Sequence, residues 1–143
     1  MRAVLDTNVL VAGLRSRRGA SFRLLQLVRL RQLVPVVSVP LFFEYEDVLS
    51  RPGLLPGIPL AAVDRFLDAF LRLAELREIH FLWRPVLNDA KDEMLVDLAK
   101  AAGPGVPLIT FNVHDFAPAV RRLGLPVLTP ADAVRKVSSP CPP

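Results

Sequence analysis

Short apolar runs alternate with amphipathic stretches along this chain. The apolar runs are rich in β-branched and aliphatic residues and are bounded by turn residues, which predicts buried strands. They lie at 2–5 (RAVL), 34–39 (VPVVSV), 79–83 (IHFLW), 106–110 (VPLIT) and 126–128 (PVL). In the amphipathic stretches apolar residues recur at helical spacing. This spacing predicts helices over 21–33, 40–51, 60–76, 88–103, 117–124 and 130–137.

The order of these elements sets the fold class. Strands that alternate with helices form a parallel sheet with helices on both faces, so we expect an α/β fold. Among the helices, Ser21 is a candidate N-cap and Pro40 suits a first helical turn. In such sheets, ligands bind beyond the carboxyl ends of the strands. The residues that follow each strand are therefore the candidates for chemistry.

The chain has 143 residues, which suits one domain with one core. We expect that domain to span residues 1–136, followed by a flexible Pro- and Ser-rich tail over 137–143 that holds the single cysteine, Cys141. One cysteine excludes an intrachain disulfide. No apolar run approaches the roughly 20 residues that a membrane-spanning helix needs, and no secretory signal pattern opens the chain. The sequence thus predicts a cytoplasmic protein with no membrane partner.

Polar residues follow two of the predicted strands directly. Asp6 comes immediately after the first strand, in an otherwise apolar opening, and needs a partner because an isolated buried charge is costly. Thr110 ends the strand over 106–110, and Asn112 and Asp115 follow it. If both strands belong to one parallel sheet, these side chains lie at the same edge.

The helix over 40–51 carries a third candidate acid. Glu44 lies one helical turn beyond the strand over 34–39, and Glu46 and Asp47 lie further along. Helical periodicity does not separate Glu44 from Glu46, but proximity to the strand end favours Glu44.

The helix over 88–103 supplies a fourth acid. Asp92 borders the apolar face and lies in the first turn, where the helix dipole favours negative charge, whereas Glu93 and Asp97 are expected on the solvent side. That apolar face consists of Met94, Leu95, Leu98, Ala99 and Ala102. The alternative is that Asp89 and Asp92 only cap the helix.

Four carboxylates at one sheet edge, Asp6, Glu44, Asp92 and Asp115, cannot all be ionised without a cation, because like charges raise each other's pKa. Oxygen ligands favour hard ions, here Mg²⁺ or Mn²⁺. Such an ion activates water and stabilises charge on a phosphate, which suits phosphodiester cleavage.

Four segments, VLDTNVLVAG, FEYEDVLSRPG, DAKDEMLVDLAKAAG and PLITFNVHDF, resemble in order and spacing the signature segments of the PIN-domain family. The resemblance runs from residue 1 to about 128. It implies a three-layer α/β/α fold around a parallel sheet. Most bacterial members of this length are VapC-type toxins, which are Mg²⁺- or Mn²⁺-dependent endoribonucleases neutralised by a cognate antitoxin.

The resemblance also implies residue roles. Asp6, Glu44 and Asp92 match the first, second and third acids of the family, and Asp115 is the better match to the fourth, with Asn112 as the other candidate. Asp6, Asp92 and Asp115 are then the expected metal ligands. The expected supporting polar residues are Asn8, Thr110 and Asn112. Asn8 could instead serve only the turn between strand and helix.

Charge and apolar content suggest partners. The net charge is +4, and 15 of the 18 basic residues are arginine. Arginine matches phosphate oxygens, so Arg15, Arg17 and Arg18 are candidates for binding nucleic acid, here RNA. A GC-rich genome would also favour arginine. The apolar fraction of 52% exceeds what one small core requires, which favours a homodimer and an antitoxin interface.

The residues also bear on three alternatives to a toxin nuclease. A haloacid-dehalogenase-like phosphotransferase needs an aspartate two positions after the first, where this chain has Asn8. A non-catalytic PIN-like module that binds RNA or protein stays open, although the acids are present. An RNA-processing nuclease that is not a toxin also stays open.

Overall fold

The computed structural model describes residues 1–139. The strands are β1 (Arg2–Leu5), β2 (Val34–Val37), β3 (Glu75–Leu76), β4 (Leu108–Ile109) and β5 (Val127–Leu128). The helices are α1 (Thr7–Arg15), α2 (Ala20–Arg29), α3 (Val39–Leu49), α4 (Leu60–Leu73), α5 (Ala90–Ala102), α6 (Ala117–Leu123) and α7 (Pro130–Ser138), with a 3₁₀ turn, η1 (Val113–Phe116), before α6. The predicted alternation of strands and helices is confirmed, and α1 adds a helix directly after the first strand.

The five strands form one parallel sheet in the order β3-β2-β1-β4-β5. Strand β1 lies at its centre, with Val4 opposite Leu108 and Leu5 opposite Ile109 in β4. Its last three residues are fully buried. The chain builds the sheet outward from β1 in both directions. The carboxyl ends of β1 and β4 are therefore the switch point at which such sheets bind ligands.

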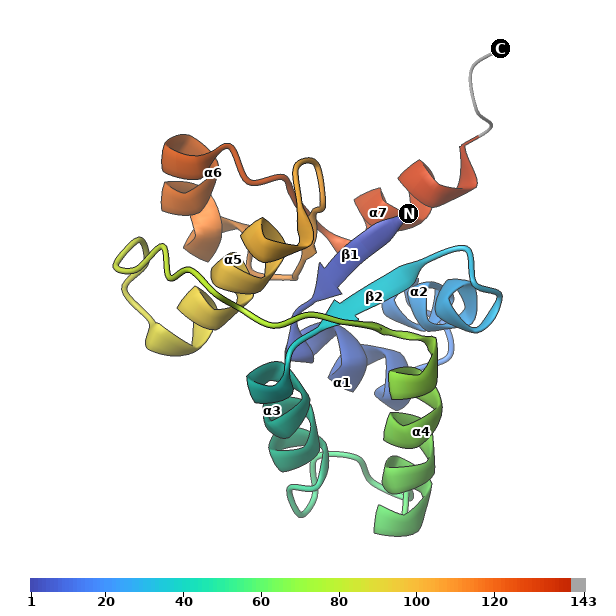
Figure 1. Ribbon diagram of the computed structural model, residues 1–143. Coiled ribbons are helices and arrows are strands. Elements are labelled where there is room, and N and C mark those ends of the chain that lie inside the picture. Colours follow the sequence, from blue (N-terminus) through green and yellow to red (C-terminus); the bar gives the residue numbers. More distant parts are fainter. Residues whose placement is uncertain (140–143) are drawn as a thin grey trace.

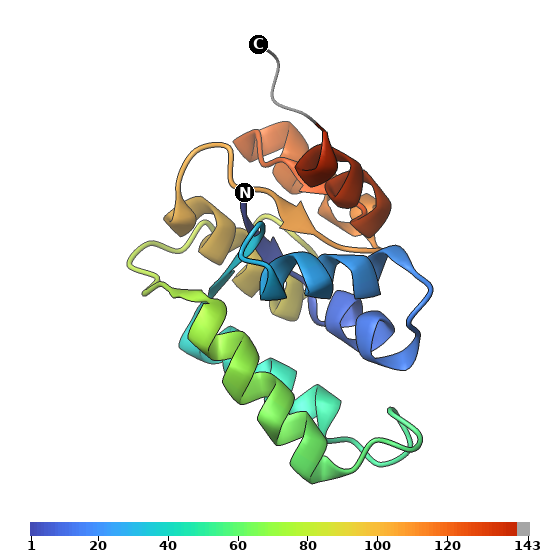
Figure 2. The same cartoon turned by 90° about the vertical axis from the view of Figure 1, so that its right-hand side faces the viewer.

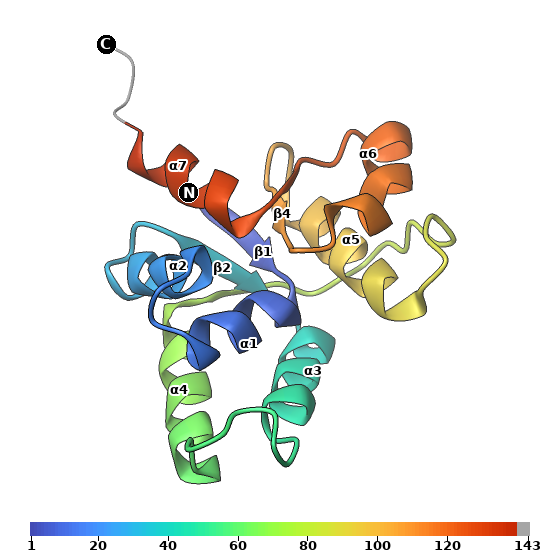
Figure 3. The same ribbon diagram turned by 180° about the vertical axis from the view of Figure 1, so that it is seen from behind.

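The sheet lies between two layers of helices, as Figures 1 and 2 show. Helix α5 contacts β1, β2 and β4 on one face. On the other face α2 contacts both α1 and α7 (Figure 3). Helices α3 and α4 pack against each other and project beyond the sheet. The three-layer α/β/α arrangement is thus confirmed.

The third strand differs from its predicted position. It lies at Glu75–Leu76, whereas residues 79–83 (IHFLW) form no strand. The backbone N–H of Arg77 donates to the carbonyl of Val37, at the end of β2. Because β2 has no further residues to pair with, the apolar run over 79–83 continues past the sheet edge instead.

The start of α2 also differs from its predicted position. Gly19, in extended conformation, is the N-cap, and the helix begins at Ala20. Ser21, the predicted cap, is 2% exposed, and its hydroxyl has no hydrogen-bond partner among residues 1–139. The chain enters the helix two residues before the predicted cap, so Ser21 occupies an inward-facing position in the first turn.

At the C-terminus, α7 includes Val137 and Ser138, the first two residues of the predicted tail. Ser139 is the C-cap of α7, and the rest of the predicted tail, residues 140–143 with Cys141, lies outside the described residues. None of the helices within residues 1–139 combines the length and apolar character needed to cross a bilayer.

Candidate acidic active site

Asp6 lies between the end of β1 and the start of α1. Its backbone N–H donates to the carbonyl of Ile109 at 2.9 Å, which extends the pairing with β4 by one residue. Its side-chain Oδ2 accepts a hydrogen bond from the Thr110 hydroxyl at 2.8 Å. Thr110 is itself fully buried. The two strand ends therefore hold the Asp6 carboxylate at the edge of the sheet.

Glu44 reaches the same edge from α3. The helix begins after Ser38, whose hydroxyl accepts from the Leu41 N–H, and Thr7 donates its hydroxyl to Glu44 Oε2 at 2.8 Å. Glu46 is exposed on the same helix. Between the two acids that periodicity could not separate, the structure puts Glu44 beside Asp6.

Tyr45 lies close to both of these acids. It is fully buried, and its phenol donates to the carbonyl of Leu5, the last residue of β1. Burial, and then the charges of Asp6 and Glu44, raise the pKa of Tyr45 well above its usual value. The phenol is therefore a neutral donor that ties α3 to β1. Sequence reasoning missed this role and that of Thr7, although each directly follows one of the acids.

Asp92 enters from α5. The helix begins after Asp89, whose carboxylate accepts from the Lys91 N–H at 2.9 Å. Asp92 makes no such capping bond, and it is half-buried. Asp89 is therefore the residue that caps the helix, whereas Asp92 faces the site.

The electrostatics show that the acids lie within range of one another. Burial, and after it the charges of Asp6, Asp89, Asp115 and Glu44, together raise the pKa of Asp92 to about 6. Burial also raises the pKa of Asp6, with a further contribution from Glu44, against the opposing hydrogen bond from Thr110. Without a cation, the fold therefore disfavours ionisation of Asp6 and Asp92.

Asp115 lies across a cleft from Asp92. Two hydrogen bonds from backbone N–H groups order the turn that carries Asp115. The Asn112 N–H donates to Thr110 Oγ1 at 3.0 Å, and the Asp115 N–H donates to the Asn112 carbonyl at 3.0 Å. The cleft has a volume of about 410 Å³. Its lining includes Asn88, Asp89, Asp92, His114, Asp115 and Arg121. The side chains of Asn112 and Asp115 are both exposed.

The donor set fits a hard divalent cation in its chemistry. All four acids offer oxygen, and the raised pKa values of Asp6 and Asp92 are the kind of strain that a bound cation relieves. Within residues 1–139, however, no three His, Cys, Asp or Glu side chains are close enough together to hold an ion as they stand.

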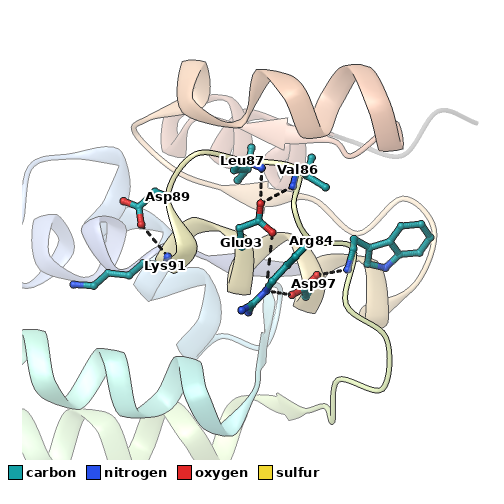
Figure 4. Close-up of polar contacts among 8 residues, drawn as sticks. Arg84, Val86, Leu87, Asp89, Lys91, Glu93 and Asp97 are labelled. Atoms are coloured by element: carbon teal, nitrogen blue, oxygen red, sulfur yellow. Dashed lines mark hydrogen bonds and ion pairs between the residues drawn. The ribbon is translucent and has the colours of Figure 1, made fainter.

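Glu93 and Asp97 are not on the solvent side as predicted. They are 4% and 1% exposed and bind the connector between β3 and α5 (Figure 4). Glu93 accepts from the backbone N–H groups of Val86 and Leu87. The prediction failed because this irregular connector covers the polar face of α5, and its N–H groups need acceptors once they leave water.

Arg84 completes this buried network. Its Nε donates to Asp97 Oδ2 at 2.8 Å and lies 4.0 Å from Glu93 Oε2. Asp97 also accepts from the Trp83 N–H at 2.9 Å. The network anchors residues 83–87, which lead directly into Asn88 and Asp89 at the cleft.

Asn8, in α1, and the predicted RNA-binding arginines do not line the cleft between Asp92 and Asp115. Asn8 is half-buried, and its Oδ1 has no hydrogen-bond partner in the described chain. Arg15 ends α1, and Arg17 and Arg18 follow in the loop; all three are exposed. Arg15 lines a groove that also contains Phe111.

Residues 2–114 match a protein family described as PIN domain. Among solved structures, a chain of VapBC2 from Rickettsia felis bound to a DNA fragment from their promoter shares the fold, with a TM-score of 0.62 and 16% identity. The match covers 90% of this chain and 98% of that one. No curated protein matches this chain.

Proposed function

Because the chain belongs to the PIN domain family, we propose that it is a divalent-metal-dependent endoribonuclease. The observation that carries the proposal is the electrostatic coupling of four acids at the carboxyl edge of β1 and β4. Asp92, with its pKa raised to about 6, lies within range of Asp6, Glu44 and Asp115. Groups with strongly perturbed pKa values in a cleft are typical of functional sites.

In this proposal Asp6, Asp92 and Asp115 hold Mg²⁺ or Mn²⁺. When bound, the ion supplies Lewis-acid stabilisation of charge on the phosphate and acidifies a water. Thr110 orients the Asp6 carboxylate, and Thr7 occupies Glu44 Oε2. The other oxygen of Glu44, Oε1, is then the atom that accepts a proton from the attacking water.

We further propose a toxin role with a cognate antitoxin and a homodimeric state. One solved structure with this fold is VapBC2 from Rickettsia felis, bound to a DNA fragment from the promoter. Several large apolar side chains around β3 and the connector are exposed and would suit such interfaces. They are Val39, Leu76, Phe81 and Leu82. An RNA-processing nuclease without a toxin role would share the same acidic site.

The proposed activity is tested by incubating the protein with a mixed single-stranded RNA pool. We expect cleavage with Mg²⁺ or Mn²⁺ and none with EDTA, with activity restored when excess Mn²⁺ is added back. Cleavage that persists in EDTA would contradict the metal-dependent mechanism. RNA binding without cleavage under any of these conditions would favour the non-catalytic module.

A further inference from the structure

A groove separate from the acidic cleft adjoins the same sheet edge. Its volume is about 360 Å³. It is lined by Thr7, Asn8, Val11, Ala12, Arg15, Val48 and Phe111. Thr7 directly follows Asp6, and Phe111 directly follows Thr110, whose hydroxyl binds Asp6. Two of the residues that line the groove therefore directly follow the hydrogen-bonded pair Asp6 and Thr110.

Phe111 is the unusual residue in this groove. It is an aromatic side chain in the turn after β4, and it is 51% exposed. The turn does not need it, because the turn is ordered by the Thr110 hydroxyl and the Asn112 carbonyl. An isolated exposed apolar residue is common on protein surfaces. This one lines a groove that also contains Arg15.

The groove also carries positive charge. Arg15 lines it at the last turn of α1, and Arg17 and Arg18 extend the positive charge into the next loop. Within residues 1–139 these three arginines form no ion pair with an acid. They are therefore available to an anionic ligand. An aromatic side chain and a guanidinium group that line one groove match a nucleobase joined to a phosphate.

We propose that this groove binds one nucleotide of single-stranded RNA next to the cleavage position. Phe111 stacks on the base, and Arg15 pairs with the adjoining phosphate. This inference rests on the proposed ribonuclease function and adds where the substrate lies. It also predicts a preference for single strands, because a base in a duplex has both faces covered by its neighbours.

The test is the binding of a short fluorescein-labelled RNA by fluorescence anisotropy, in EDTA so that nothing is cut. Replacing Phe111 with alanine should weaken single-strand binding about tenfold, whereas Phe111→Tyr should bind like the parent. The dependence of log Kd on log salt should not change in Phe111→Ala. In Arg15→Gln the slope should fall by about 0.7, the loss of one phosphate contact to a single strand.

Leu60→Ala is the control, because Leu60, the first residue of α4, is an exposed large apolar side chain, 61% accessible, that lines neither the groove nor the acidic cleft. It should bind RNA like the parent. Equal binding by Phe111→Ala and the parent would overturn the proposal, as would failure of the parent to bind single-stranded RNA. Equal weakening of duplex binding in Phe111→Ala would overturn it too.

Measuring cleavage of the same RNA in Mn²⁺ distinguishes failure of this inference from failure of the proposed function. Phe111-dependent binding without cleavage would refute the nuclease and keep the groove. Cleavage with a KM unchanged in Phe111→Ala would keep the nuclease and refute the groove.

Discussion

Replacing Asp6 with asparagine should reduce metal-dependent RNA cleavage by at least about a thousandfold, equivalent to about 4 kcal/mol of lost transition-state stabilisation. Asp6 is the acid at the centre of the edge, held by Thr110 at 2.8 Å and coupled to Glu44 and Asp92. An amide keeps the shape and can still accept the Thr110 bond, but it lacks the charge that binds a cation.

The same substitution should leave the metal-free protein at least as stable as the parent. The pKa of Asp6 is raised in the folded state, first by burial and then by Glu44. A carboxyl with a raised folded pKa stabilises the fold below its unfolded pKa, and that contribution is lost as the pH rises through the folded pKa. At neutral pH the charged Asp6 therefore costs stability, and asparagine removes the cost.

Cleavage rates and thermal unfolding in EDTA, measured on the same preparations, check both halves of this prediction. Asp68→Asn is the control, because Asp68 is an exposed acid on α4, and it should change neither quantity. A variant that loses activity only because it unfolds would argue that Asp6 is structural. A stable variant that still cleaves at the parental rate would remove Asp6 from the site.

Replacing Arg84 with alanine should lower the free energy of unfolding by about 2–4 kcal/mol. The Asp97 side chain is 1% exposed, and Arg84 supplies its only cationic contact among the described residues, at 2.8 Å. Without Arg84, a buried carboxylate keeps only the N–H of Trp83. The prediction takes account of the 40% exposure of Arg84 itself, which makes the pair weaker than a fully buried one.

Urea unfolding of a double-mutant cycle measures this contribution. Adding Asp97→Asn to Arg84→Ala should recover part of the loss, because the amide carries no charge and can still accept from Trp83. Arg51→Ala, which breaks the exposed i,i+4 pair with Asp47, should cost less than about 0.5 kcal/mol. If Arg84→Ala and Arg51→Ala cost the same, the buried network does not stabilise the connector.

Local pattern was enough to predict the strands that carry the site. The first strand ends where Asp6 begins, and the helical spacing around Asp92 placed this acid at the border of the apolar face. These features depend on neighbours close in sequence, so periodicity reveals them. The register of Leu5 against Ile109, which brings Asp6 to Thr110, pairs strands distant in sequence and comes from the structure.

Hydrophobic periodicity could not predict the contacts that irregular segments make. Glu93 and Asp97 have the spacing of a solvent-facing stripe, yet the connector over 77–89 covers them. Their acceptor role depends on where that connector runs, which no repeat in the sequence encodes. The predicted position of the third strand was wrong for a related reason. The hydrogen bond from Arg77 to Val37 ends the sheet before the apolar run over 79–83 begins.

The central claim is that the acids of this edge bind a divalent cation, and calorimetric titration of the metal-free protein with Mn²⁺ tests it most directly. The affinity should fall as the pH is lowered through about 6, because Asp92 must lose its proton to bind the ion. Asp92→Asn should bind Mn²⁺ at least about tenfold more weakly, while Asp68→Asn binds like the parent. Equal affinity and equal pH dependence in Asp92→Asn and the parent would contradict the claim.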